Sequence, residues 1–238
     1  MGRAFEVRKV AMAKTAAVKS KVYAKYGREI FVAAKSGTPD PETNQNLKRI
    51  IEKAKREQVS ADVIKRAIDK AKGGSEESYT QIRYEGFGPG NSVIIVETLS
   101  DNVNRTVAEV RNCFTKTGGK LGISGSVLHQ FEHQSVFSTK DLSEEQVLEA
   151  LIENDINADI EEEKGTVSIY GDVSDYFSIK TALQSIKDAI EFEADEITWL
   201  PLVPAEITDE EEQQKFDRLL DLLNELDDVQ EVYHNAKF

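Results

Sequence analysis

The pattern of apolar residues changes at Gly73-Gly74, and this change constrains the fold of the 238-residue chain more than any other feature. Before these glycines, apolar residues recur at the spacing of amphipathic helices, and no segment alternates as a strand does. After them, short segments rich in β-branched residues alternate with helical ones. The sequence therefore predicts a helical N-terminal part followed by mixed helix and sheet.

Three helices with short connections are expected in the first part, which makes a small bundle. The first helix runs from about Ala11 to Lys35 and stops at Gly37. The second has Asp40 as its N-cap and Pro41 at its first position, and the third follows Ser60. The core-facing positions of the second and third helices are predicted to be Leu47, Ile50, Ile51, Ala54, Ile64, Ala67, Ile68 and Ala71.

The order of the later elements predicts one domain inserted in another. Residues 136–203 read β-α-β-β-α-β, a complete ferredoxin-like unit, while the flanks read β-β-α-β before it and α-β after it. The simplest assembly is a second α/β unit that is interrupted and then completed by the C-terminal segment. We therefore expect an α+β protein, with a three-helix bundle and two α/β (ferredoxin-like) domains, at residues 1–76, 77–134 plus 206–238, and 135–205.

Local signals locate three of the later helices. Ser143 and Gln146 form a capping box, and Thr208 with Glu211 is expected to open the last helix. An earlier helix, within residues 101–119, is expected to turn one apolar face to the core, formed by Val103, Val107, Val110 and Phe114.

Charge divides the chain at the same place. Residues 1–74 carry 18 Lys and Arg against 8 Asp and Glu, a net charge of +10, whereas residues 75–238 carry 12 against 35, a net charge of −23. Such a contrast points to a polyanion-binding segment attached to an acidic body. The alternative is a solvated helical face that uses lysine for solubility.

The cations of the first helix gather on one side. At about 100° per residue, five of them fall within an arc of roughly 80°, and the apolar residues of a neighbouring arc can face the bundle. A cationic stripe of this kind fits repeated phosphate contacts, but it does not distinguish DNA from RNA. The predicted nucleic-acid-binding residues are Arg8, Lys9, Lys14, Lys21, Lys25, Arg28, Lys35, Lys48 and Arg49.

Two other polar or flexible features have both a structural and a functional interpretation. Asn102, Asn104 and Arg105, with Asp101, form either an exposed polar contact surface or the N-cap and turn that start a helix. The glycines at 118, 119, 122 and 125 either form a loop near a ligand or stop a helix and turn the chain. The structural interpretation is favoured for both.

No residues suggest catalysis. Three separated histidines and the single Cys113 make a poor zinc site, and no nucleophile has supporting His and Asp residues. The sequence therefore predicts no catalytic residue, no metal and no cofactor. One cysteine fits a reducing compartment, and the chain shows neither a membrane-length apolar run nor a signal peptide. We expect a cytoplasmic protein that does not contact a membrane.

The chain resembles the YebC/PmpR family over nearly its whole length. The resemblance is densest at Tyr84-Glu85-Gly86, Gly88-Pro89-Gly90, Asp101-Asn102, Asn104-Arg105-Thr106, Gly118-Gly119, Leu121-Gly122 and Gly125-Ser126-Val127. It implies a helical N-terminal domain and two α/β domains, the middle one inserted into the last. Phe5 stands where the longer form of the family has a Trp. In this respect the chain resembles the shorter paralogue group of the family.

The family resemblance also implies a function. Bacterial members are described as transcriptional regulators that bind DNA, the mitochondrial relative is a translational activator, and some bacterial members are linked to stalled ribosomes. We therefore expect a DNA-binding transcriptional regulator acting through the basic helical domain. The alternative is a ribosome-associated translation factor that binds ribosomal RNA. In either case the acidic domains could contact a protein partner.

Overall fold

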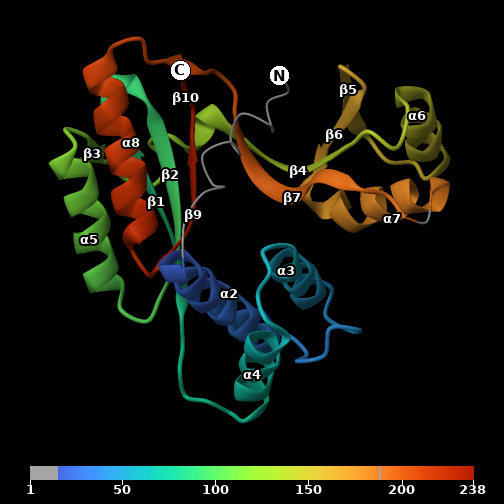
Figure 1. Ribbon diagram of the computed structural model, residues 1–238, viewed down its shortest axis with the longest axis horizontal. Helices are drawn as coiled ribbons and strands as arrows, with labels where there is room; N and C mark the ends of the chain where they lie inside the picture. Colours follow the sequence, from blue (N-terminus) through green and yellow to red (C-terminus); the bar gives the residue numbers. More distant parts are fainter. Residues whose placement is uncertain (1–15, 188) are drawn as a thin grey trace. The chain divides into compact units, whose positions relative to one another are not determined.

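The structure is a computed structural model that describes residues 16–187 and 189–238 (Figure 1). The chain divides into two compact units, one built from residues 129–204 and the other from the described residues before 129 together with 205–238. The expected α+β class is confirmed, because a helical region precedes two regions of mixed helix and sheet. The domain boundaries predicted above stay a prediction.

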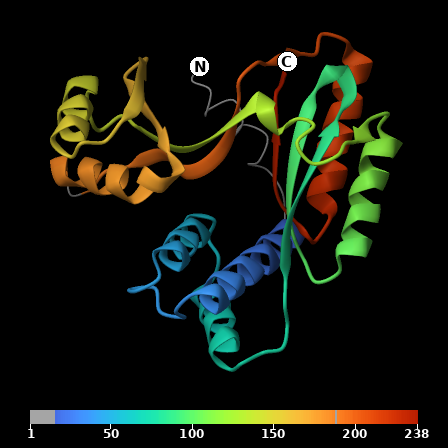
Figure 2. The ribbon, with the colours of Figure 1, turned by 180° about the vertical axis from the view of Figure 1, so that it is seen from behind.

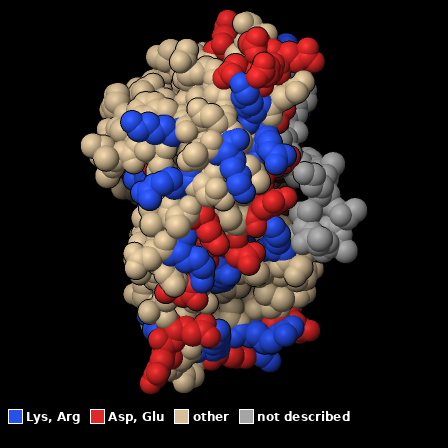
Figure 3. Space-filling view, turned by 90° about the vertical axis from the view of Figure 1, so that its left-hand side faces the viewer, with Lys and Arg blue, Asp and Glu red and all other residues tan. Residues whose placement is uncertain are grey.

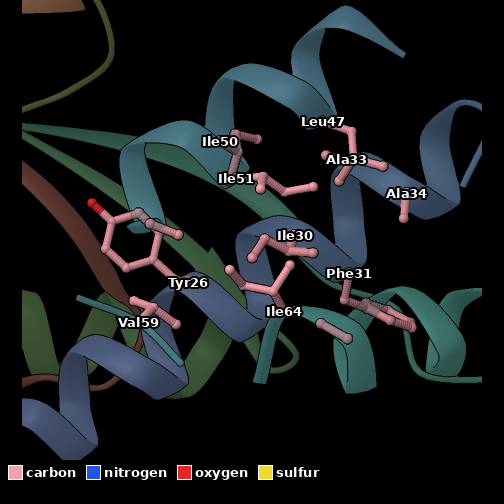
Figure 4. Close-up of a cluster of buried hydrophobic side chains, with 12 residues drawn as sticks. Tyr26, Ile30, Phe31, Ala33, Ala34, Leu47, Ile50, Ile51, Val59 and Ile64 are labelled. Atoms are coloured by element: carbon pink, nitrogen blue, oxygen red, sulfur yellow. The ribbon is translucent and has the colours of Figure 1, made fainter. Parts of the chain in front are cut away.

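The helical region contains α2 (Ala16–Ser36), α3 (Gln45–Arg56) and α4 (Ala61–Lys72). Apolar side chains of the three helices meet in one buried core, shown in Figure 4. The predicted core positions of α3 are all buried, and those of α4 are buried or partly buried. The first five residues of the expected first helix, 11–15, lie outside the described residues.

The start of α3 corrects the prediction that Asp40 is its N-cap. Asn44 caps this helix, because its side-chain oxygen accepts a hydrogen bond from the Leu47 N–H. Asp40 instead closes a turn, in which its carbonyl accepts from the Asn44 N–H. The Asn44 amide also donates to the carbonyls of Ala33 and Thr38, at 2.9 and 2.8 Å. One side chain therefore joins the end of α2 to the start of α3.

The second part of this unit is a four-stranded sheet in the order β3-β1-β2-β9. Its strands are β1 (Thr80–Phe87), β2 (Val93–Ser100), β3 (Lys120–Leu121) and β9 (Val229–His234), all paired antiparallel. Helices α5 (Val103–Lys116) and α8 (Glu210–Glu225) cover one face (Figures 1 and 2). The chain after residue 204 thus completes a sheet that begins at Thr80, and β8 (Ala205–Glu206) pairs with β10 (Ala236–Lys237) beside it.

Two helices of this unit differ from the sequence-based expectation. Asp209 rather than Thr208 caps α8, since its carboxylate accepts from the Glu212 N–H. On α5, Val103 is exposed, and Thr106 lies buried with Val110, Cys113 and Phe114. The reason is that the Thr106 hydroxyl donates to a buried carboxylate, which turns a polar position inward.

A buried carboxylate on β1 holds the glycine-containing segment after β3. Glu85 accepts hydrogen bonds from the backbone N–H groups of Gly125, Val127 and Leu128, at 2.6, 2.7 and 2.9 Å. Burial raises the pKa of Glu85, but these donors outweigh burial and lower it overall. Gly125 has a φ of +84°, so glycine is required there by the turn. The structural interpretation of this glycine is confirmed.

The unit of residues 129–204 has the ferredoxin-like order β5-β6-β4-β7, with every neighbouring pair antiparallel. Helices α6 and α7 contribute buried residues to one core with this sheet. The capping box of Ser143 and Gln146 is confirmed. The elements are β4 (Phe131–Thr139), α6 (Glu144–Glu153), β5 (Ala158–Glu163), β6 (Thr166–Asp172), α7 (Tyr176–Ile186) and β7 (Phe192–Pro201).

Candidate nucleic-acid interface

The predicted binding residues fall on two helices of the bundle. Lys21, Lys25, Arg28 and Lys35 lie on α2, and Lys48 and Arg49 lie on α3. The structure does not describe the other three predicted cations, Arg8, Lys9 and Lys14. Phe5, where the sequence differs from the longer form of the family, also lies outside the described residues. Their binding role stays a prediction, whereas the contacts of the described ones are clear.

The cations of α2 contact the segment that joins α8 to β9, within the same compact unit. Lys21 Nζ donates to the Glu225 carbonyl oxygen at 2.8 Å. Arg28 donates to the Asp227 carbonyl oxygen at 2.6 Å and to the Asp228 carboxylate at 3.1 Å. The stripe on α2 therefore already has oxygen partners inside the protein, so a nucleic-acid phosphate meets competition at these side chains.

Glu231 on β9 is the second acidic partner of the bundle. Its Oε1 accepts from Lys25 Nζ at 3.0 Å and from Lys53 Nζ at 2.7 Å. Burial raises the pKa of Glu231, but the two ammonium groups outweigh burial and bring that pKa to about 2. This carboxylate is therefore charged at neutral pH and links α2 and α3 to the sheet.

Asp228 is the centre of a buried polar network. Its carboxylate accepts from the hydroxyls of Ser100 and Thr106, at 2.9 and 2.6 Å, and from Arg105 at 2.6 Å. Its side chain is only 4% exposed. Burial raises the pKa of Asp228, but hydrogen bonds from Thr106, Arg105 and Ser100 lower it overall. Together with Arg28, these donors surround a charge that would be costly to bury alone.

This network clarifies the polar motif of residues 101–105. Asn102 caps α5, because its side-chain oxygen accepts from the Arg105 N–H at 3.1 Å. The Arg105 guanidinium also pairs with Asp101 at 2.8 Å, and Asn104 is exposed. The structural interpretation of Asn102 is thus confirmed, while a contact role for Asn104 and Arg105 stays a prediction.

Lys35 lies at the end of α2 and fixes the chain that leads into β1. Its ammonium donates to the carbonyl oxygens of Ser75 and Glu77, at 2.9 and 2.6 Å. On α3, Arg49 donates to the Asn46 side chain at 3.2 Å and is half-buried. Lys48 is exposed. Among the predicted cations that the structure describes, Lys21, Lys35 and Lys48 are exposed, and Lys25, Arg28 and Arg49 are half-buried.

Sequence reasoning identified Lys48 but missed three other exposed lysines of these helices, Lys55 on α3 and Lys65 and Lys72 on α4. Lys48 and Lys55 are seven residues apart on α3, and Lys65 and Lys72 are seven apart on α4. Seven residues are close to two turns, so each pair lies on one side of its helix with a rise of about 10 Å. The heptad spacing of lysines on the polar face was the signal that could have identified them.

Basic and acidic side chains are interspersed on one face of the molecule. On the face drawn in Figure 3, groups of Lys and Arg lie beside groups of Asp and Glu and do not merge into one continuous basic field.

Among residues 16–187 and 189–238, no three His, Cys, Asp or Glu side chains are arranged to hold a metal ion. Cys113 is buried, and burial raises the pKa of its thiol. Within the same ranges, no helix combines the length and hydropathy needed to cross a membrane.

Comparison with known proteins identifies the family. A model described as "TACO1/YebC protein N-terminal domain" matches residues 3–74, and one described as "TACO1/YebC second and third domain" matches residues 79–236. A crystal structure of a conserved hypothetical protein from Aquifex aeolicus is similar, with a TM-score of 0.79, 37% identity, and coverage of 97% of this chain and 96% of that one.

Two relatives match over nearly their full length. A "Probable transcriptional regulatory protein" from Acholeplasma laidlawii is 59% identical, and one from Alteromonas mediterranea with the same descriptive name is 54% identical. Each match covers 99% of this chain and 98% of the relative. These names are regulatory rather than enzymatic. The chain therefore belongs to the TACO1/YebC family, whose similar members are named probable transcriptional regulatory proteins.

Proposed function

We propose that this protein regulates transcription by binding DNA through its basic helical region, residues 1–74. The observation that carries this proposal is the arrangement of exposed lysines on α3 and α4. The buried core of the bundle fixes both helices, so Lys48, Lys55, Lys65 and Lys72 are held at the surface in two evenly spaced pairs. Lysines held in this way neutralise backbone phosphates and release counterions.

The cations of α2 have a different role in this proposal. Lys25 and Arg28 pair with Glu231 and Asp228, so we assign them to positioning the bundle on the sheet. The exposed lysines of α3 and α4 supply the direct phosphate contacts, and Lys21, Lys35 and Arg49 are further phosphate contacts in this proposal. The predicted contacts of Arg8, Lys9 and Lys14 remain part of the proposal.

The acidic remainder of the chain orients the protein on DNA. Residues 75–238 have a net charge of −23, and this charge repels phosphate and directs the basic region toward the duplex. We expect the acidic α/β regions to contact a protein partner rather than nucleic acid. The regulatory names of the relatives support the proposal, and we expect the protein to act in the cytoplasm without a cofactor.

The experiment compares two double charge reversals in the full-length chain. Lys48→Glu with Lys55→Glu removes one lysine pair, and Lys116→Glu with Lys120→Glu makes the same charge change at exposed residues of α5 and β3. Duplex DNA binding is measured by fluorescence anisotropy over a salt series. We expect the first variant to weaken binding and to reduce the slope of log K against log salt by about 1.8, for two lost phosphate contacts. Equal weakening by both variants would show that only total charge matters and would contradict the proposal.

A further inference from the structure

A cavity of about 280 Å³ lies between α2 and α4, closed on one side by Tyr79 of the segment before β1. Three cationic side chains line it, Arg28 from α2 and Arg66 and Lys70 from α4. Its lining contains no Asp or Glu. The charged residues of the lining are therefore all cations, although Arg28 also pairs with Asp228 and Lys70 with Glu77, neither of which lines the cavity.

Aromatic rings contact two of the three cations. Lys70 Nζ lies 5.5 Å from the centre of the Phe31 ring, and the Arg28 guanidinium carbon lies 5.9 Å from the centre of the Tyr79 ring. The two rings meet edge to face, with centres 5.9 Å apart. Cation–π contacts of this length favour a fixed position of each charged group. The cavity thus presents positioned charges rather than freely moving side chains.

Gly27 leaves one wall of the cavity open. Glycine inside a helix is less stable than alanine, and Gly27 lies within α2. An added Cβ would meet only Val63 Cγ1, at 3.9 Å, which is an ordinary contact. Packing therefore does not require glycine at this position. The missing side chain is instead consistent with space kept for a ligand.

An anionic oxygen already lies at the rim of the cavity. The Glu77 carboxylate accepts from Lys70 Nζ at 2.6 Å and from the Tyr79 hydroxyl at 3.1 Å. The Lys70 and Glu77 side chains are 46% and 48% exposed, so water competes for both groups and their pairing contributes little to stability. A ligand with more negative charge can replace this carboxylate at little cost.

We propose that the cavity binds a phosphate group, presented by the nucleic acid that the helical region binds or by a free nucleotide. In the first case the inference rests on the DNA-binding function proposed above. Lys70 and Arg66 donate to the phosphate oxygens, and the Glu77 carboxylate moves out. Arg66 uses its Nε–H to bond the Asp62 carbonyl at 3.2 Å, and a guanidinium has further N–H donors for a ligand. The bound phosphate group occupies the space beside Gly27.

The test uses the full-length chain with two probes, pyrophosphate in titration calorimetry and duplex DNA in anisotropy. Arg66→Gln with Lys70→Gln replaces two cations with neutral amides, and Gly27→Leu fills the cavity without a change of charge. Arg111→Gln, at an exposed residue of α5, is the control for the loss of an arginine. Circular dichroism and thermal unfolding verify that each variant is folded, and the double glutamine variant serves if Gly27→Leu does not fold.

We expect both cavity variants to weaken pyrophosphate binding by about tenfold or more, and Arg111→Gln to leave it unchanged. Glu77→Gln is expected to strengthen binding several-fold, because it removes the competing charge. If DNA binding also depends on Gly27 and Lys70, the phosphate is that of the nucleic acid. If the chain binds no DNA but binds pyrophosphate through the cavity, the proposed function is wrong and the cavity is a site for free nucleotides. Pyrophosphate binding that is absent, or unaffected by both cavity variants, would overturn the inference while leaving the DNA-binding proposal open to its own test.

Discussion

The guanidinium of Arg28 and the carboxylate of Asp228 lie 3.1 Å apart and join α2 to the segment before β9. The same carboxylate accepts hydrogen bonds from Ser100, Thr106 and Arg105. A cation that the sequence assigns to phosphate binding is thus part of a buried network that connects the helical bundle to the sheet.

Asp228→Asn is expected to reduce the free energy of unfolding by about 3 kcal/mol. The substitution leaves the shape of the side chain but removes the charge that Arg28 and Arg105 share, and breaking a buried ion pair is costly. Urea unfolding followed by circular dichroism measures the change. Asp227→Asn is the control, because Asp227 is exposed and Arg28 uses only its backbone carbonyl. Similar losses in both variants would show that the buried network has no special importance.

The lowered pKa of the Glu231 carboxylate makes the stability of the fold depend on pH. Its pKa is about 2 in the folded chain and near 4.3 in an unfolded one. Because the folded pKa is the lower, the unfolded state binds more protons between these values, so stability falls as the pH drops from about 4.5 to 2. The side chain is one third exposed, so we expect a contribution of about 2 kcal/mol after solvent screening. Glu231→Gln should flatten the curve in this range, and an unchanged curve would contradict the assignment.

Glu85→Gln is expected to loosen the segment of residues 122–128. An amide at this position retains one acceptor oxygen and turns a donor group toward the N–H groups of Gly125, Val127 and Leu128, so buried donors lose their partners. Hydrogen exchange should show faster exchange of these three amide protons, with a loss of stability of about 2 kcal/mol. Glu76→Gln, at an exposed residue, controls for the charge. Unchanged exchange would show that the segment is held by other contacts.

Much of the fold could be predicted from the sequence because it depends on local patterns. The helical spacing of Leu47, Ile50, Ile51 and Ala54 and the capping box at Ser143 report on neighbours within a few residues, and both were confirmed. The order of strands and helices likewise indicated that the C-terminal segment returns to the first sheet, and β9 pairs with β2.

The candidate site was harder to predict because its partners are distant in the sequence. No sequence periodicity relates Lys25 to Glu231 or Arg28 to Asp228. From the sequence alone, a stripe of cations on α2 that binds phosphates therefore looks the same as one that pairs with carboxylates of the same chain. The cavity beside Gly27 was missed for the same reason, since Tyr79 and the cations of α4 approach it only in the folded chain.

The start of α3 offers a test of local prediction. Asn44→Ala is expected to cost more than about 1 kcal/mol of stability, the usual loss for an N-cap, because Asn44 also bonds the Ala33 and Thr38 carbonyls. Asp40→Ala should cost less, since Asp40 contributes only one side-chain hydrogen bond, to the Glu42 N–H. Thermal unfolding of the two variants measures the difference. A larger loss at Asp40 would favour the sequence-based assignment of the cap.

The measurement that tests the central claim most directly is a titration of the full-length chain with duplex DNA over a salt series, with ribosomal RNA as competitor. If the four exposed lysines of α3 and α4 contact phosphates, the slope of log K against log salt is about −3.6 or steeper, and equal amounts of ribosomal RNA do not displace the duplex. Absence of duplex binding near physiological salt would contradict the claim that this protein binds DNA, and displacement by a small amount of ribosomal RNA would contradict the claim that DNA is its target.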